Sequence, residues 1–314
     1  MDDAKLELQA QIAWLYYVGG LTQQEIAKKV GLSRPTVQRL LNLAIDSGIV
    51  QVKIDHTSNL CMDLANRLKA KFNLSECDVA PVEDETVAQT DRLVAMSSAR
   101  FLEQALRTPS IKGIALGTGH AIRAMCHGVS RYHLDDFKVV SLAGTVASDG
   151  SFNRYDASLS LAEKTDGKYY ILSIPLFAED EQDRAYWYAS RTYVRQLSNY
   201  DDCHLALIGV GWVGHNCSLV QDGFVTDAVM DDLVTQGAVA DVLGWILDGD
   251  GQPIAHPIND CITSFRPEIL QQRPVIGVAG GVRKHAAISA ALKGGWLTGL
   301  ITDQRTAEYL LQHS

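Results

Sequence analysis

Residues 21–41 read LTQQEIAKKVGLSRPTVQRLL, and this stretch decides the fold of the amino-terminal part of the chain. Thr22 and Glu25 have the three-residue spacing of a capping box, which marks the start of a helix. Gly31 marks its end, because glycine accepts the left-handed backbone of a helix terminus at little cost. Ser33 follows as the cap of a second helix. The stretch therefore predicts two short helices joined by a tight turn.

The same stretch resembles the helix-turn-helix of many bacterial regulators. An amphipathic segment at 5–18 predicts a preceding helix, and the alternating segment at 49–54 predicts a strand that forms a wing. The second helix of the motif turns arginine, glutamine and threonine outward, and these side chains reach base edges and phosphates. The alternative is a three-helix module that binds no nucleic acid. The candidate DNA-binding residues are Gln23, Ser33, Arg34, Thr36, Gln38 and Arg39.

Charge is distributed in a way that suits this interpretation. The chain of 314 residues has a net charge of −9, but residues 22–53 carry five basic and two acidic side chains. This segment therefore has a charge of +3, and the remainder has −12. A local basic face on an acidic body is consistent with site-specific DNA binding, because the body's charge suppresses indiscriminate contact with phosphates.

Composition limits the other classes of protein. No apolar run reaches the 18–20 residues, roughly, that cross a bilayer, and the acidic amino terminus is unlike a signal peptide. The six cysteines are scattered and form no C-x-x-C pair. This pattern predicts reduced thiols in the cytoplasm, with no zinc or other metal site and no cofactor.

The remainder of the chain alternates apolar runs with helical stretches, which predicts a mainly parallel sheet covered on both faces. We expect a DNA-binding domain at 1–55, a linker helix within 56–74 and an effector domain at 75–314. The linker helix, whose apolar stripe is narrow, packs either on its own domain or on a second subunit. The expected strands are 78–82, 111–116, 138–142, 169–174, 204–210, 275–279 and 299–302. The expected helices are 87–106, 120–130, 157–164, 183–199, 227–236, 286–293 and 303–312.

Ligands of such sheets bind at the carboxyl ends of the strands. Three loops there combine glycine with hydroxyl or cationic groups, which suits a hydroxylated or phosphorylated ligand. Each loop alone is equally consistent with a plain turn between a strand and a helix. The first loop holds Gly117, Thr118 and Gly119, the second Gly144 and Thr145, and the third Gly280, Gly281 and Lys284.

A G-x-G-x-x-G sequence at 209–214 raises the alternative of a dinucleotide-binding enzyme. Such a motif should open a helix and should lie in the first strand–helix unit of the domain. The residues after it read as a loop, and the motif lies past the middle of the domain. The sequence therefore argues against a nicotinamide or flavin site.

The chain as a whole resembles the SorC/DeoR-type sugar-responsive transcriptional regulators of bacteria. The resemblance rests on the helix-turn-helix at 21–34, the strand at 205–211, the run GAVADVLG at 237–244 and the long run from Val275 to Glu308. It implies an all-α winged helix-turn-helix followed by an α/β domain similar to sugar-phosphate isomerases. It also implies a homodimer or homotetramer that binds operator DNA and a sugar, polyol or sugar-phosphate effector.

The resemblance further implies that Asp241 and Lys284 line the effector pocket together with the first two loops. Relatives often have paired glycines in the second loop, whereas here Thr145 follows Gly144. This departure leaves both a phosphorylated effector and a free sugar or polyol open. The rival function is an isomerase or deaminase that carries a DNA-binding segment, with Asp241 as base and Lys284 as electrophile.

Overall fold

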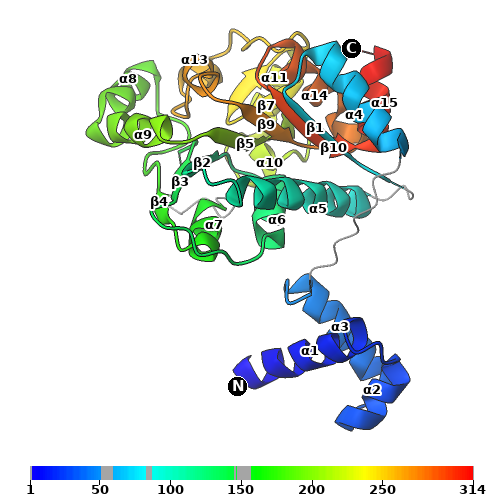
Figure 1. The fold of residues 1–314 in the computed structure, drawn as a ribbon. Helices are drawn as coiled ribbons and strands as arrows, with labels where there is room; N and C mark the ends of the chain where they lie inside the picture. Colours follow the sequence, from blue (N-terminus) through cyan, green and yellow to red (C-terminus); the bar gives the residue numbers. More distant parts are fainter. Residues whose placement is uncertain (1, 51–58, 83–86, 145, 147–156, 314) are drawn as a thin grey trace. The chain divides into compact units, whose positions relative to one another are not determined.

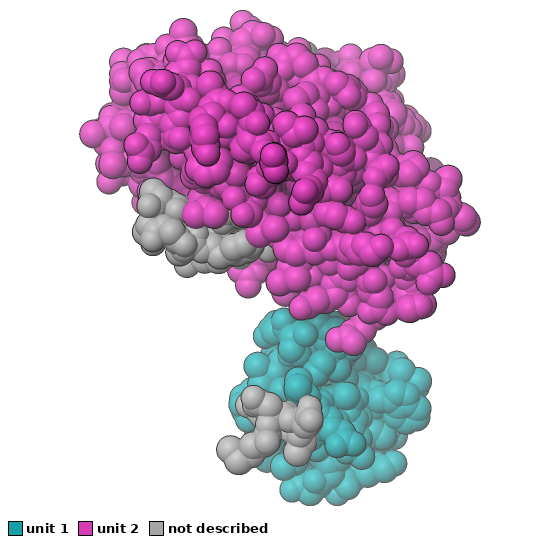
Figure 2. Space-filling view, turned by 90° about the vertical axis from the view of Figure 1, so that its left-hand side faces the viewer, with its two compact units in different colours: residues 1–56 teal, residues 57–314 magenta. Residues whose placement is uncertain are grey.

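The computed structural model describes the chain except residues 1, 51–58, 83–86, 145, 147–156 and 314. It divides into two compact units, residues 1–56 and 57–314, which Figure 2 colours separately. Within the described residues, no helix is long and apolar enough to span a membrane.

The first unit consists of helices α1 (Asp2–Tyr17), α2 (Gln23–Val30) and α3 (Arg34–Asp46). The predicted capping box is present: the Thr22 hydroxyl accepts from the Glu25 amide, and the Glu25 carboxylate accepts from the Thr22 amide. Gly31 ends α2 with a φ of 70°, the left-handed conformation that glycine allows. The helices enclose a core of Ile12, Ala13, Leu15, Ile26, Ala27, Val37, Leu40, Leu41 and Ala44. Most of the predicted wing, from residue 51 on, lies outside the described residues.

A seven-stranded parallel sheet forms the centre of the second unit, in the order β1-β10-β9-β5-β2-β3-β4. Its strands correspond one by one to the seven predicted from the sequence. They are β1 (Glu76–Ala80), β2 (Gly113–Leu116), β3 (Lys138–Ser141), β4 (Lys168–Tyr170), β5 (Leu205–Gly209), β9 (Val275–Val278) and β10 (Gly299–Asp303).

Helices cover both faces of this sheet, as predicted (Figure 1). Alternate residues of each strand enter different apolar clusters; in β2, for example, Ala115 belongs to one and Ile114 to the other. One face packs against α5 (Val87–Leu106), α6 (His120–Gly128) and α7 (Ser158–Thr165). The other packs against α4 (Asn59–Phe72), α9 (Arg191–Asp201), α14 (His285–Lys293) and α15 (Gln304–His313).

The linker helix α4 packs within the second unit, on β1 and α15. Its Leu64 and Leu68 are buried in the core on that side of the sheet. The Lys71 ammonium donates to the carbonyls of Leu310 and Leu311, at 3.0 and 3.1 Å, near the end of α15. Contacts within the chain therefore cover most of the narrow stripe, whereas Leu60 at its start is exposed.

Two features differ from the sequence prediction. The helix expected at 183–199 is two helices, α8 (Glu181–Ala189) and α9. Ser190 separates them because its backbone is extended and its hydroxyl accepts from the Tyr193 amide, as the cap of α9. The second difference is a small antiparallel sheet, β6 (Gly211–Trp212), β7 (Ala240–Val242) and β8 (Trp245–Leu247). Its strands of two or three residues are too short to show an alternating pattern.

The remaining elements are short and lie mostly in the connections around the small sheet. They are α10 (Ser218–Gln221), α11 (Asp227–Thr235), α12 (Pro257–Asp260), α13 (Pro267–Leu270) and the 3-10 turn η1 (Val282–Lys284).

Candidate functional site

The sheet changes its direction of winding between β2 and β5. From β2 the chain passes through α6 to β3 on one side, whereas from β5 it proceeds to β9 on the other. Two such neighbouring strands leave a crevice at their carboxyl ends, where ligands of open α/β sheets bind. The loop with Gly117, Thr118 and Gly119 leaves β2 at this point, so the topology supports it as part of a binding site.

Glycine is present at the two positions of this loop for different structural reasons. A Cβ on Gly117 would lie 2.8 Å from the Leu243 side chain, in the turn between β7 and β8. Gly119 has a φ of 115°, and a Cβ there would meet nothing within 4 Å. α6 begins directly after Gly119 without a side-chain cap. The first amides of α6 can therefore donate to oxygens of a ligand.

Asp241 extends from β7 toward β6. Its carboxylate accepts from the Gly244 amide at 2.8 Å, and a Cβ on Gly211 would lie 2.8 Å from its Oδ2. The carboxyl is enclosed, although the residue as a whole is only partly buried. Burial raises the pKa of Asp241 to about 6, while the Gly244 amide and the Lys284 charge act in the opposite direction.

Lys284 ends η1 and directly precedes α14, and its ammonium is also enclosed. Burial lowers the pKa of Lys284, while the carboxylates of Asp91 and Asp241 counteract this shift. Because α14 packs against β7, the structure brings Lys284 and Asp241 near each other although 42 residues separate them in the chain. Asp91 lies in α5 and was not predicted as a site residue; its position near the start of the helix that follows β1 is the signal that could have marked it.

Close packing explains why residue 144 is glycine, and the sequence did not reveal this. It is buried, and a Cβ there would approach the carbonyl of Pro175 to well under 3.0 Å. Val146 continues the contact as a bridge to Pro175. Thr145, the other predicted residue of this loop, lies outside the described residues.

The third loop is held by a residue that the sequence analysis did not select. The Asp303 carboxylate, at the end of β10, accepts from the amides of Gly281 and Thr306 at 2.7 and 3.0 Å. A Cβ on Gly280 would collide with the same carboxylate. The Gly281 amide is therefore already used within the chain. The expectation that the amides of this loop hold a ligand is wrong for Gly281.

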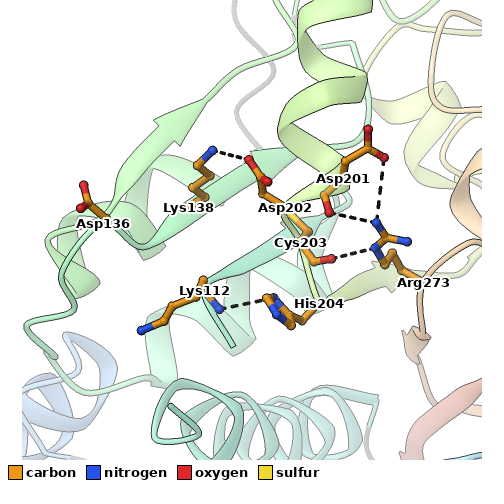
Figure 3. A pocket seen from close by; sticks show the side chains of 8 residues that line it. All are labelled: Lys112, Asp136, Lys138, Asp201, Asp202, Cys203, His204 and Arg273. Carbon is orange, nitrogen blue, oxygen red and sulfur yellow. Dashed lines mark hydrogen bonds and ion pairs between the residues drawn. The ribbon is translucent and has the colours of Figure 1, made fainter. Parts of the chain in front are cut away.

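Two hollows in the described structure lie away from these loops. One of about 620 Å³ opens at the amino ends of β2, β3 and β5 (Figure 3). There Lys138 pairs with Asp202, and the Arg273 guanidinium donates to the carbonyls of Cys203 and Asp201. Because these charges already satisfy one another, and because parallel sheets bind ligands at the opposite edge, we assign the candidate site to the carboxyl ends.

In the first unit, five of the six predicted DNA-binding residues belong to α3 or to its amino-terminal cap. Arg34, Gln38 and Arg39 are exposed on α3. Ser33 caps the start of that helix. Its hydroxyl accepts from the Thr36 amide at 3.3 Å and lies 2.8 Å from the Thr36 hydroxyl. Gln23 is the first residue of α2 and is partly exposed.

The structure also bears on the alternatives raised by sequence motifs. Gly209 ends β5 and Gly211 begins the antiparallel strand β6, so the G-x-G-x-x-G sequence opens a strand and not the helix that a dinucleotide site requires. Among the described residues, no group of three or more His, Cys, Asp and Glu side chains could hold a metal ion. The six cysteines are free.

Two family models of known proteins match the chain, one in each compact unit. A family model described as "Putative sugar-binding domain" matches residues 56–312, and a homeodomain-like model matches residues 3–53. The erythritol catabolism regulatory protein EryD of Brucella abortus is 31% identical over 314 residues, which cover 99% of this chain and 98% of that protein. The transcriptional regulator LsrR of Escherichia coli K12 is 30% identical, over 98% of this chain and 95% of its own.

Solved structures show the same architecture. The full-length sorbitol operon regulator SorC from Klebsiella pneumoniae superimposes with a TM-score of 0.71 at 25% identity, over 99% of this chain and 100% of its own. The fold and the relatives define a transcriptional regulator with a helix-turn-helix and a sugar-binding domain, and not an enzyme. The chain belongs to the SorC family of sugar-responsive regulators.

Proposed function

We propose that this regulator binds operator DNA through α3 and that a sugar, polyol or sugar phosphate, bound at the carboxyl ends of β2 and β5, changes that binding. The controlled operon would serve carbohydrate or polyol use, since the relatives are named for erythritol catabolism and a sorbitol operon. Such a protein acts in the cytoplasm.

The observation that carries the proposal is that α14, which directly follows Lys284, packs against β7, which holds Asp241, near the crevice. Leu243, two residues beyond Asp241, contacts the position of Gly117 in the first loop. An enclosed carboxylate and an enclosed ammonium are costly to bury, and a ligand whose hydroxyls donate to Asp241 and accept from Lys284 offsets part of that cost. Thr118 and the first amides of α6 supply further donors for hydroxyl or phosphate oxygens.

The DNA-binding residues and the proposed effector site belong to different compact units. We propose that two or four copies assemble and that the effector favours one arrangement of them. The operator would then hold inverted half-sites separated by whole helical turns, about 10 base pairs or a multiple of it.

The test starts from a thermal-shift screen of sugars, polyols and their phosphates, since a ligand of the folded state raises its apparent stability. Comparison of each compound with its phosphate separates the two effector classes. We expect Lys284→Ala and Asp241→Ala to abolish the effect of the compound on operator binding, while operator affinity without it stays near wild type. If calorimetry finds that both variants bind the compound with wild-type affinity, the effector binds elsewhere.

A further inference from the structure

The exposed face of α3 continues one helical turn beyond the predicted DNA-binding residues. Arg34, Gln38 and Asn42 are four residues apart and all exposed, so they lie on one side of the helix. Val37 and Leu41 are buried in the core of the unit. From Arg34 to Asn42 the helix rises about 12 Å, close to the roughly 12 Å width of the major groove of B-DNA.

Folding gives no reason for asparagine at this position. Asparagine is among the poorer helix formers, and an exposed site in the second half of a helix favours alanine, lysine or glutamate instead. Asn42 caps neither end of α3, which runs from Arg34 to Asp46. Within the described part of the chain, its carboxamide makes no hydrogen bond that would explain its presence.

The charges around Asn42 indicate DNA as the occupant of this face. Arg34 and Arg39 precede it on α3, and both are exposed. Asp46, one turn beyond, is exposed as well, and its carboxylate would be repelled by phosphates. A DNA-facing surface on α3 would therefore end before Asp46.

We propose that Asn42 reads an adenine of the operator from the major groove, next to Gln38. A carboxamide carries one acceptor and two donors, which match the N6 amino group and N7 of adenine in a bidentate pair. This inference rests on the proposed function, because it assumes that α3 enters the major groove.

The test selects binding sites for the full chain from a library of randomised double-stranded DNA. Wild type, Asn42→Ala and a matched control, Gln11→Ala, are compared; Gln11 is an exposed carboxamide on α1 of the same unit. We expect Asn42→Ala to lose the preference for one A·T pair in each half-site and to bind the wild-type consensus about 10-fold more weakly. Gln11→Ala should select the wild-type sequence.

Two further measurements separate base reading from other roles. The salt dependence of affinity should be the same for Asn42→Ala as for wild type, because a neutral side chain displaces no counterion. Thermal unfolding should be unchanged or shifted upward, since alanine favours the helix.

Each outcome decides one of the two claims. If wild type selects a consensus and Asn42→Ala selects the same one with equal preference at every position, the inference about Asn42 is wrong and the proposed function stands. If Asn42→Ala weakens binding to all sequences equally, the residue contacts the backbone and reads no base. If wild type selects no consensus, operator binding itself fails, and this inference fails with it.

Discussion

The proposed DNA-binding surface and the proposed effector site of this regulator are built in opposite ways. The first is one face of α3, and its residues lie within nine positions of one another, from Arg34 to Asn42. The second combines the turns after β2 and β7 with the start of α14, which are about 125 and 40 residues apart in the chain. A local surface follows from caps and helical spacing, whereas a surface assembled from distant segments depends on how those segments pack.

The two sites also differ in how they hold charge. Arg34 and Arg39 are exposed, so replacing them changes what the protein binds and leaves its core intact. Asp241 and Lys284 are enclosed, and the charge of each affects the pKa of the other, so replacing either one should affect the fold as well as the proposed site. Mutations in the assembled site should therefore change stability, and mutations on the recognition face should not.

The largest effect is expected for Gly144→Ala. The added Cβ would collide with the Pro175 carbonyl, a backbone atom that a change of rotamer cannot move, so we expect a loss of about 3 kcal/mol in the free energy of unfolding. Urea unfolding followed by tryptophan fluorescence measures it. Gly249→Ala is the matched control, because a Cβ there meets nothing within 4 Å, and it should leave stability unchanged or slightly higher. Unchanged stability of Gly144→Ala combined with weaker effector binding would make Gly144 a ligand residue instead.

The second prediction concerns the pH dependence of the assembled site. The pKa of Asp241 is raised to about 6 in the folded protein, above the value of about 3.9 in an unfolded chain. The folded state therefore binds the proton more tightly, and this contribution to stability is present below about pH 4 and is lost by pH 6 to 7. The free energy of unfolding of wild type relative to Asp241→Asn should fall by about 2–3 kcal/mol over that range. A difference that stays constant from pH 4 to pH 7 would show that burial does not control this carboxyl.

The third prediction addresses the recognition face. Arg39→Ala, or Arg34→Ala, should weaken binding to the selected operator by about 1–3 kcal/mol and relax specificity at one base pair, because a bidentate base contact is lost. The thermal unfolding temperature should not change, since both side chains are exposed. Gel-shift titrations with wild-type affinity for both variants would remove α3 from the DNA interface.

This contrast also explains how far the sequence could predict the structure. The caps at Thr22 and Ser33 and the left-handed Gly31 act within a few residues, so the helix-turn-helix could be predicted in detail. Most strands of the large sheet lie in apolar runs, which a single sequence displays directly. In contrast, the break at Ser190 was missed because a serine within a helical pattern looks like an ordinary exposed position.

The assembled site was predicted only in part, for a physical reason. Asp241 and Lys284 were predicted from a family resemblance. Their proximity depends on a small sheet of very short strands, which no periodicity in the sequence reveals. Asp91 and Asp303 were missed because their roles arise only when α5 and β10 pack beside the third loop. Gly144 looked like a ligand-binding glycine, although what requires it is the nearby carbonyl of Pro175.

The smallest effect is expected for Thr22→Ala. This variant tests whether short-range contacts stabilise the helix-turn-helix. The Thr22 hydroxyl satisfies the Glu25 amide at the start of α2, and an alanine there leaves that donor without its partner in the chain. Native-state hydrogen exchange in the full chain should show the opening free energy of amides in α2 and α3 reduced by about 1 kcal/mol. Thr22→Ser keeps the hydroxyl and should restore the wild-type value. Amides of the large sheet should exchange as in wild type, because the capping box lies in the other compact unit. An equal loss of protection in both units would contradict the view that the helix-turn-helix is stabilised by its own short-range contacts.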